Sequence, residues 1–252
     1  MKTMMKGLNA VLSLALLCAW SGAGAQAQQD TTRILVTVAH LKPEKVNEWR
    51  SLQQNEVIPA LKKAGIATRL TLETLFGDRP EFVTLRPLAS FAEFDGTGAL
   101  EKALGAKGAA ALGAKIQACE VSTQRYIINR QNEFTLGKID APVRVTTTYR
   151  VAPGQAQAYR QFLRDYILPL DRRGVQENKV AGFSVAISGN GSPEPGLWIQ
   201  STYLPNAAAL DAPGLANQLL DEAQRNLLNA RIAELRVTVR SAVRRTVPEL
   251  SY

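Results

Sequence analysis

The only histidine of the chain, His40, is the first residue that could perform chemistry. Imidazole is the side chain whose ordinary pKa lies near neutrality, so it suits proton transfer at physiological pH. His40 ends an alternating apolar segment that predicts a strand, next to a predicted helix start. We predict His40 as a candidate general base, with a surface or capping role as the alternative. A single histidine excludes a two-histidine metal site, and no G-x-S-x-G motif accompanies it.

Strand-forming segments that contain arginine are the second candidate for chemistry. Because side chains alternate between the two faces of a strand, one face of each segment can be assigned to an interior space. This alternation predicts these interior residues: Arg69, Glu73 and Arg86 in the first half of the chain, and Arg144, Thr148, Arg150, Trp198 and Arg240 in the second. Glu73 can neutralise only one of these arginines, and a buried arginine without a partner is unfavourable.

The excess of interior arginine predicts a cleft that binds an anionic or carbonyl-bearing small molecule. Arginine suits this role because its guanidinium donates hydrogen bonds in a planar, forked geometry. The alternative is that these arginines lie at the open ends of a barrel and extend their long side chains into water. The formal net charge of +8 also favours anionic ligands.

Motifs for cofactors are absent from the sequence. The glycines around Gly105 and Gly108 lack the spacing of a phosphate-binding loop or a dinucleotide fingerprint. Cys119 is predicted to be a small buried group, with a reactive or intermolecular thiol as the alternative. We therefore expect no metal and no cofactor, and the sequence leaves open whether the protein is an enzyme.

The elements that position these residues occur twice, because one phrase of the sequence recurs 110 positions later. The first copy contains Pro43, Trp49, Arg50, Leu52, Asn55, Val57, Ile58 and Pro59, and the second contains Pro153, Tyr159, Arg160, Phe162, Asp165, Ile167, Leu168 and Pro169. Self-similarity at a fixed spacing indicates that one folding unit was duplicated. The two prolines at the end of the phrase lie inside predicted helices, which predicts a bend shared by both copies.

Each copy is predicted to contain a strand, a helix, two strands, a helix and a final strand. In the first copy the strands cover 33–41, 66–76, 81–88 and 121–136, with helical segments at 42–64 and 90–118. In the second they cover 143–151, 180–188, 197–204 and 236–247, with helical segments at 154–173 and 215–235. This order is the ferredoxin-like arrangement, an antiparallel sheet with both helices on one face. We predict an α+β protein of two ferredoxin-like repeats, 28–137 and 138–252, packed sheet to sheet as a pseudo-dimeric α/β barrel.

The repeated helix carries a resemblance to a known superfamily. Its two copies, VNEWRSLQQNEVIPALKKAG and AQAYRQFLRDYILPLDRRG, and the order of elements are similar to those of the dimeric α/β-barrel superfamily in a fused tandem form. The resemblance extends to its NIPSNAP-like, antibiotic-monooxygenase-like and stress-responsive barrel groups. Membership would imply the fold but no single reaction, because the superfamily includes cofactor-free monooxygenases, isomerases, haem-handling enzymes and proteins without known activity.

The N-terminal segment, residues 1–27, has the layout of a cleaved signal peptide. Lys2 and Lys6 precede an apolar run from Leu8 to Trp20, and small residues follow around Ala23-Gly24-Ala25. We therefore predict a periplasmic or secreted protein without a stable membrane span. Export also leads us to expect no nucleic-acid partner.

Three functions remain open at this stage. The first is an exported small-molecule-binding protein with a polar cleft between the two sheets. The second is a cofactor-free monooxygenase-like or isomerase-like enzyme, in which His40 is the base and an arginine polarises a carbonyl. The third is a structural or interaction protein whose barrel interior is simply packed. Further homodimerisation is open in each case.

Overall fold

The structure, a computed structural model, describes residues 31–252, which form one compact unit. The predicted signal peptide lies outside the described residues. In the part of the chain that the structure describes, no helix is long and apolar enough to cross a membrane.

The first half of the described chain contains four strands and two helical segments. Strand β1 (Thr31–Leu41) leads through a short 3-10 turn (Pro43–Lys45) to α1 (Val46–Leu52), a π-helical turn η2 (Gln53–Val57) and α2 (Ile58–Lys63). Strands β2 (Leu70–Thr74) and β3 (Glu81–Pro87) follow. The 3-10 turn η3 (Phe91–Phe94), α3 (Ala99–Cys119) and β4 (Glu120–Gly137) complete this half. Helix α3 is kinked at Gly105, where φ is 72°.

The second half repeats this order. It contains β5 (Val143–Val151), α4 (Ala156–Phe162), the π-helical turn η4 (Leu163–Ile167), α5 (Leu168–Gln176), β6 (Gly182–Ser188) and β7 (Trp198–Leu204). The 3-10 turn η5 (Ala207–Asp211), α6 (Leu215–Leu219), α7 (Glu222–Leu235), β8 (Arg236–Thr246) and a last 3-10 turn η6 (Pro248–Leu250) follow. The predicted order of strands and helices is therefore present in both halves.

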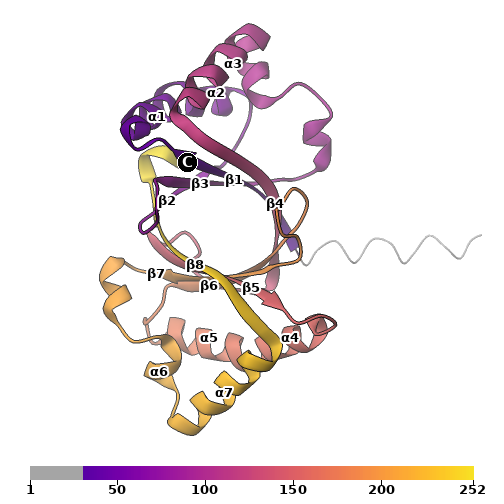
Figure 1. Cartoon of the computed structure of the whole chain (residues 1–252), viewed down its shortest axis with the longest axis vertical. Helices are drawn as coiled ribbons and strands as arrows, with labels where there is room; N and C mark the ends of the chain where they lie inside the picture. The colour runs from indigo at the N-terminus through magenta and orange to yellow at the C-terminus, as the bar shows by residue number, and fades with distance from the viewer. Residues whose placement is uncertain (1–30) are drawn as a thin grey trace, which may run out of the picture. The chain divides into compact units, whose positions relative to one another are not determined.

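The eight strands close into one antiparallel barrel in the order β1-β3-β2-β8-β5-β7-β6-β4. The strands of each half are consecutive, and the halves join where β2 pairs with β8 and β4 pairs with β6. The two sheets therefore share hydrogen bonds along their edges as well as facing each other, which leaves fewer strand edges unpaired. Figure 1 shows α1, α2 and α3 on one outer side of the barrel and the helices of the second half on the opposite side.

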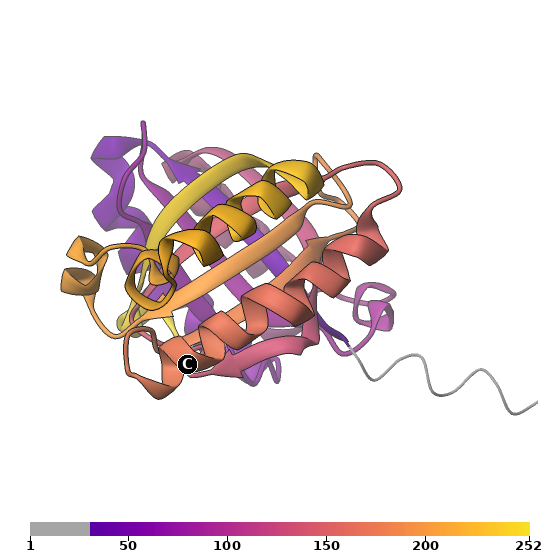
Figure 2. The ribbon, with the colours of Figure 1, turned by 90° about the horizontal axis from the view of Figure 1, so that it is seen from below.

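Aromatic pairs hold the helices to the outer face of the barrel at equivalent places in both halves. The rings of Trp49 and Phe82 are 4.8 Å apart, and those of Tyr159 and Trp198 are 4.9 Å apart. Figure 2 shows the long helices of the second half lying across its strands. A separate buried cluster lies on the inner face of the first half and consists of Ile34, Val36, Val38, Leu72 and Val83. The barrel thus has cores on both of its faces.

The predicted shared bend takes the form of a π-helical turn in each half. The backbone N–H of Ile58 donates to the carbonyl of Gln53, and that of Leu168 donates to the carbonyl of Leu163. Each turn ends two residues before the last proline of the repeated phrase, Pro59 in the first copy and Pro169 in the second. A π-turn widens the helix locally, so a residue without an N–H group fits there.

Candidate functional site

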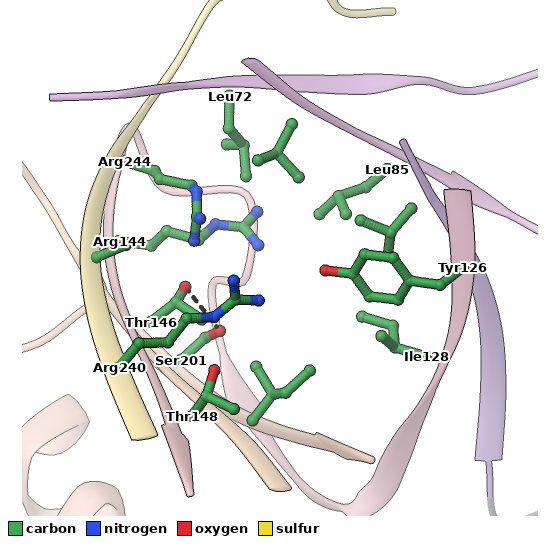
Figure 3. A pocket seen from close by; sticks show the side chains of 14 residues that line it. Leu72, Leu85, Tyr126, Ile128, Arg144, Thr146, Thr148, Ser201, Arg240 and Arg244 are labelled. Carbon is green, nitrogen blue, oxygen red and sulfur yellow. Dashed lines mark hydrogen bonds between the residues drawn. The ribbon is translucent and has the colours of Figure 1, made fainter. Parts of the chain in front are cut away.

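A cavity of about 60 Å³ lies inside the barrel. It is lined from the first half by Val36, Leu72, Val83, Leu85, Tyr126 and Ile128, and from the second half by Arg144, Thr146, Thr148, Ile199, Ser201, Arg240, Ala242 and Arg244. Figure 3 shows three arginine side chains projecting from one side toward the apolar side chains of the other. The cavity is therefore polar and cationic on one side and apolar on the other.

Arg144 of β5 is the most unusual residue of the cavity. Only 7% of it is exposed, and no carboxylate of the described residues lies within salt-bridge distance of its guanidinium. Its Nε has no hydrogen-bond partner, while the guanidinium carbon lies 4.9 Å from the ring centre of Tyr203. Burial lowers the pKa of Arg144 from its ordinary value, and the positive charge of Arg244 acts in the same direction against the influence of Tyr203. A buried guanidinium without a neighbouring anion strongly attracts an anionic ligand.

Further donors surround Arg144. Arg240 of β8 also lines the cavity and is exposed, and among the described residues it takes part in no ion pair. Thr148 and Ser201 are buried, and the hydroxyl of Ser201 lies 3.3 Å from that of Thr146. Because hydroxyl groups can donate as well as accept, these side chains could share an anion with the two arginines.

Arg244 differs from its two neighbours because it is neutralised. It donates to Glu81 at 2.8 Å and to Thr74 at 3.1 Å. Burial alone would raise the pKa of Glu81, but the charge of Arg244 and the hydrogen bond from Thr74 outweigh it, and the pKa lies below its ordinary value. The ion pair between Arg244 and Glu81 therefore leaves Arg144 and Arg240 as the arginines available to a ligand.

His40 contacts the other side of this ion pair. Its Nε2 lies 3.2 Å from Glu81, and its Nδ1 lies 3.1 Å from the hydroxyl of Ser122. His40 is not among the residues that line the cavity. The structure thus places the candidate base beside a carboxylate, with the geometry of an acid–base pair, but outside the cavity wall.

Three of the predicted ligand-binding residues, Arg144, Thr148 and Arg240, lie together in the cavity. They come from β5 and β8, where the alternation of the sequence identifies the inner face correctly. Arg150 follows an irregularity of the β5 ladder, is exposed and pairs with Glu194 in the loop between β6 and β7. It therefore lies outside the cavity.

The inward orientation predicted for four other residues is wrong. Arg69 donates to Gln53 of η2 at 2.7 Å, and Glu73 pairs with Arg50 of α1 at 2.9 Å. Arg86 pairs with Glu93 of η3, and Trp198 packs on Tyr159 of α4. All four side chains point toward the helices, while their strand neighbours Leu72, Leu85 and Ile199 face the cavity. A register error of one residue moves every side chain of a strand to the other face, which explains why these errors occur together on β2, β3 and β7.

Two residues of the cavity wall, Arg244 on β8 and Tyr126 on β4, are not among those predicted from the sequence. Arg244 lies four residues after Arg240 on β8, so the same alternation would have placed it in the interior. Tyr126 on β4 opposes Val36 of β1, and its hydroxyl points toward the arginines in Figure 3. The pairing of β1 with β4 joins distant segments of the chain, and no local sequence pattern predicts it.

Solved structures of similar fold support the barrel assignment. A protein described as a monooxygenase from Fusobacterium nucleatum matches with 12% identity over 86% of this chain and 93% of its own, at a TM-score of 0.57. An anthrone oxidase-like protein matches with 16% identity over 87% of this chain and 92% of its own, at 0.52. A protein described as a chlorite dismutase matches with 11% identity over 87% and 96%, at 0.50.

These matches show a shared fold and nothing about the reaction, because sequence identities this low carry no information about chemistry. No protein-family profile and no curated protein matches the sequence. The resemblance to NIPSNAP-like proteins therefore rests only on the repeated helix and the order of elements. This chain has an α+β fold with a closed antiparallel barrel of eight strands, and the matches support that fold alone.

Proposed function

We propose that this protein binds a small anionic molecule inside its barrel, and that its function is binding and not catalysis. The observation behind the proposal is Arg144, a buried guanidinium that faces the cavity without a carboxylate partner among the described residues. Removing a charge from water is unfavourable by several kcal/mol unless a counter-charge compensates it. A bound anion would supply that counter-charge, with Arg240 and the nearby hydroxyls as additional donors.

The fold supports this function if the barrel is a fused pair of ferredoxin-like units. The strand order is β4-β1-β3-β2 in the first half and β8-β5-β7-β6 in the second, so equivalent strands occupy equivalent places. In this pseudo-dimer the cavity lies between two related sheets, and each can change its lining independently of the other. Export is part of the same proposal and rests on the signal-like residues 1–27. Sequencing the N-terminus of the purified protein would test it.

The other two functions receive less support. Some proteins of similar fold are described as monooxygenases, but His40 does not line the cavity, so no specific observation favours base catalysis there. A simply packed interior would leave no reason for an unpaired arginine beside a cavity. Haem does not fit either: a cavity of about 60 Å³ is far too small for the macrocycle, and the only histidine lies outside it.

The binding of inorganic and organic anions to the purified protein tests this function. Nitrate and acetate should raise the melting temperature, and the shift should grow with the logarithm of ligand concentration above Kd, as expected for any ligand that binds only the folded state. Arg144→Gln should weaken their binding by roughly tenfold or more, because a charge-assisted hydrogen bond is lost. Arg150→Gln is the matched control, since Arg150 is exposed and lies outside the cavity.

Calorimetric titration should give the same ranking of variants as the thermal shift. Equal binding of nitrate and acetate by wild type, Arg144→Gln and Arg150→Gln would reject the cavity as the site. An absence of binding to wild type would reject the function.

A further inference from the structure

Five pairs of corresponding inner positions have diverged in one direction, whereas Val83 and Ile199 are both apolar and Tyr126 corresponds to Ala242. Partners across the strand pairs identify which positions correspond: Val36 opposes Leu85, and Thr146 opposes Ser201. In the same way, Ile34 opposes Ile128, and Arg144 opposes Arg244. The corresponding pairs are Ile34 and Arg144, Val36 and Thr146, Val38 and Thr148, Leu85 and Ser201, and Ile128 and Arg244. At each of these positions the first half carries an apolar side chain and the second half a polar or charged one.

The apolar wall of the first half is closely packed and shielded from water. Leu72 and Val36 are each 2% exposed, and Val83 is 5% exposed. A fully hydrated anion would leave this wall facing water inside the cavity, which is unfavourable for apolar surface. A ligand that covers the wall with carbon atoms would remove that contact.

The cationic wall occupies one side of the cavity only. Figure 3 shows Arg144 and Arg240 extending from β5 and β8, while Leu72, Leu85 and Ile128 lie opposite them. A second carboxylate on the same ligand would therefore lie against leucine and isoleucine, where a single donor, the hydroxyl of Tyr126, compensates little of its desolvation. The hydroxyl of Tyr126 is the one polar group that reaches in from the apolar side.

The cavity also limits the size of a ligand. A volume of about 60 Å³ holds only a few water-sized groups, since one water needs roughly 10–15 Å³ of such space. This space suits a carboxylate with a short hydrocarbon body and excludes large fused-ring systems from the interior.

We infer that the ligand is a short-chain monocarboxylate, with its carboxylate at Arg144 and Arg240 and its hydrocarbon body against Leu72, Leu85 and Val36. This inference rests on the anion-binding function proposed above. It adds that the duplicated sheet has specialised, so that the second half recognises charge and the first half recognises hydrocarbon. Affinity should then depend on both halves, each through a different part of the ligand.

A homologous series of ligands measures the contribution of the apolar wall. Calorimetric titration of wild type with formate, acetate, propionate and butyrate should show binding that tightens by roughly fourfold for each added methylene. Nitrate should bind no better than formate. Succinate should bind at least about tenfold more weakly than butyrate, because its second carboxylate loses hydration and gains at most the hydroxyl of Tyr126 as a donor.

Val36→Thr assigns the effect to the apolar wall. Threonine has nearly the shape of valine and is the residue found at the corresponding position, Thr146, so the fold should tolerate it. This variant should reduce the gain per methylene to less than twofold and should change nitrate affinity less than butyrate affinity. Leu104→Ser, at an exposed leucine of α3, is the control and should leave the whole series unchanged.

The outcomes separate this inference from the function on which it rests. If nitrate and succinate bind as tightly as butyrate, and Arg144→Gln weakens all of them, the anion site stands and the monocarboxylate inference is overturned. If Val36→Thr fails to fold by circular dichroism, Leu85→Met provides a second variant, which should alter the chain-length dependence more than it alters nitrate affinity. If no anion binds to wild type, both proposals are wrong.

Discussion

Single residues in this protein carry charges in places where water does not reach them. Arg144 is buried beside the cavity without an ion-pair partner in residues 31–252. Arg236 is buried between β8 and α4. It donates to the hydroxyl of Tyr159 at 2.5 Å, and its guanidinium carbon lies 3.6 Å from the ring centre of Tyr149. Arg236 also lacks an ion-pair partner in residues 31–252, and its Nε has no hydrogen-bond partner, but its guanidinium is enclosed by aromatic rings and does not line the cavity. Arg144 faces the cavity, and this difference in position separates a candidate binding residue from a packing residue.

Asp171 of α5 is a third buried ionisable residue, and its burial predicts how the stability of the protein depends on pH. Burial raises the pKa of its carboxyl to about 7, from an ordinary value of 3.8. Between these values the folded protein retains a proton that the unfolded chain releases, so the free energy of unfolding falls as pH rises. Asp171→Asn removes this penalty and should stabilise the protein at pH 8 by on the order of a few kcal/mol. Urea unfolding at pH 4 and pH 8 measures the difference, which should shrink toward pH 4.

Asp211→Asn provides the control for this measurement, because Asp211 is exposed. It should change stability little at either pH. Equal stability of wild type and Asp171→Asn at pH 8 would contradict the argument.

Elements of the two halves share geometry while their contacts differ. At the start of β4, Glu120 accepts a hydrogen bond from the indole of Trp49, whereas at the start of β8 Arg236 donates to Tyr159. The helix residue is thus the donor in one half and the acceptor in the other. The π-helical turns, in contrast, are present in both halves at the same place. Duplicated elements therefore retain backbone geometry more strictly than the chemistry of their side chains.

The π-turn before Pro59 leads to a prediction about this proline. In a regular helix, replacing an interior proline by alanine would stabilise the protein by about 3 kcal/mol. Here the preceding turn is already widened, and a return to α-helical hydrogen bonding would rotate Ile58 and Ala60 out of the core in which they are buried. Pro59→Ala should therefore change the free energy of unfolding by less than about 1 kcal/mol.

Guanidinium unfolding of Pro59→Ala and of the equivalent Pro169→Ala tests this expectation. The two variants should behave alike. A gain near 3 kcal/mol in either one would show that the π-turn is caused by the proline and is not required by the packing.

At the scale of the whole molecule, closure of the barrel makes the halves dependent on each other. The strand pairs β2–β8 and β4–β6 are the only hydrogen-bonded seams between the halves of the described barrel. The cavity lies between walls supplied by both halves, so a change at a seam alters both stability and the cavity. We expect residues 31–252 to unfold in a single cooperative transition.

The seam between β4 and β6 depends on two glycines that oppose each other, Gly137 and Gly182. A Cβ atom at Gly182 would lie 2.8 Å from the carbonyl oxygens of Leu136 and Lys138, which are backbone atoms and cannot move aside easily. Gly182→Ala should therefore destabilise the protein by about 2 kcal/mol or more and weaken anion binding as well. Thermal unfolding and calorimetric titration measure the two effects.

Gly113→Ala is the matched control for this seam. Gly113 lies inside α3 with open space around it, so alanine should stabilise the helix by roughly 0.5–1 kcal/mol and leave binding unchanged. If Gly182→Ala is as stable as Gly113→Ala, the seam tolerates more than its geometry indicates.

Prediction from sequence succeeded on β5, where one face is apolar and the other is polar. Val143 and Val145 alternate with Arg144 and Thr146, and the inner face of β1 follows from the repeat. On β2 both faces are buried: Thr71 is fully buried and donates to the backbone of Leu250, while Leu72 faces the cavity. Alternation cannot tell two buried faces apart, because each requires shielded side chains. Polar residues packed beneath helices therefore resembled residues of a cleft.

The sequence by itself determined the duplication, the order of the elements and the presence of more arginine than carboxylate on the strands. These are properties of spacing and composition, which the chain carries whatever its conformation. Tertiary structure alone decided which arginines have partners. Glu81 neutralises Arg244 from a strand 163 residues away in sequence, and no such carboxylate reaches Arg144 within residues 31–252. Whether a charge is compensated depends on distances of a few ångströms between distant segments, and closure of the barrel sets those distances.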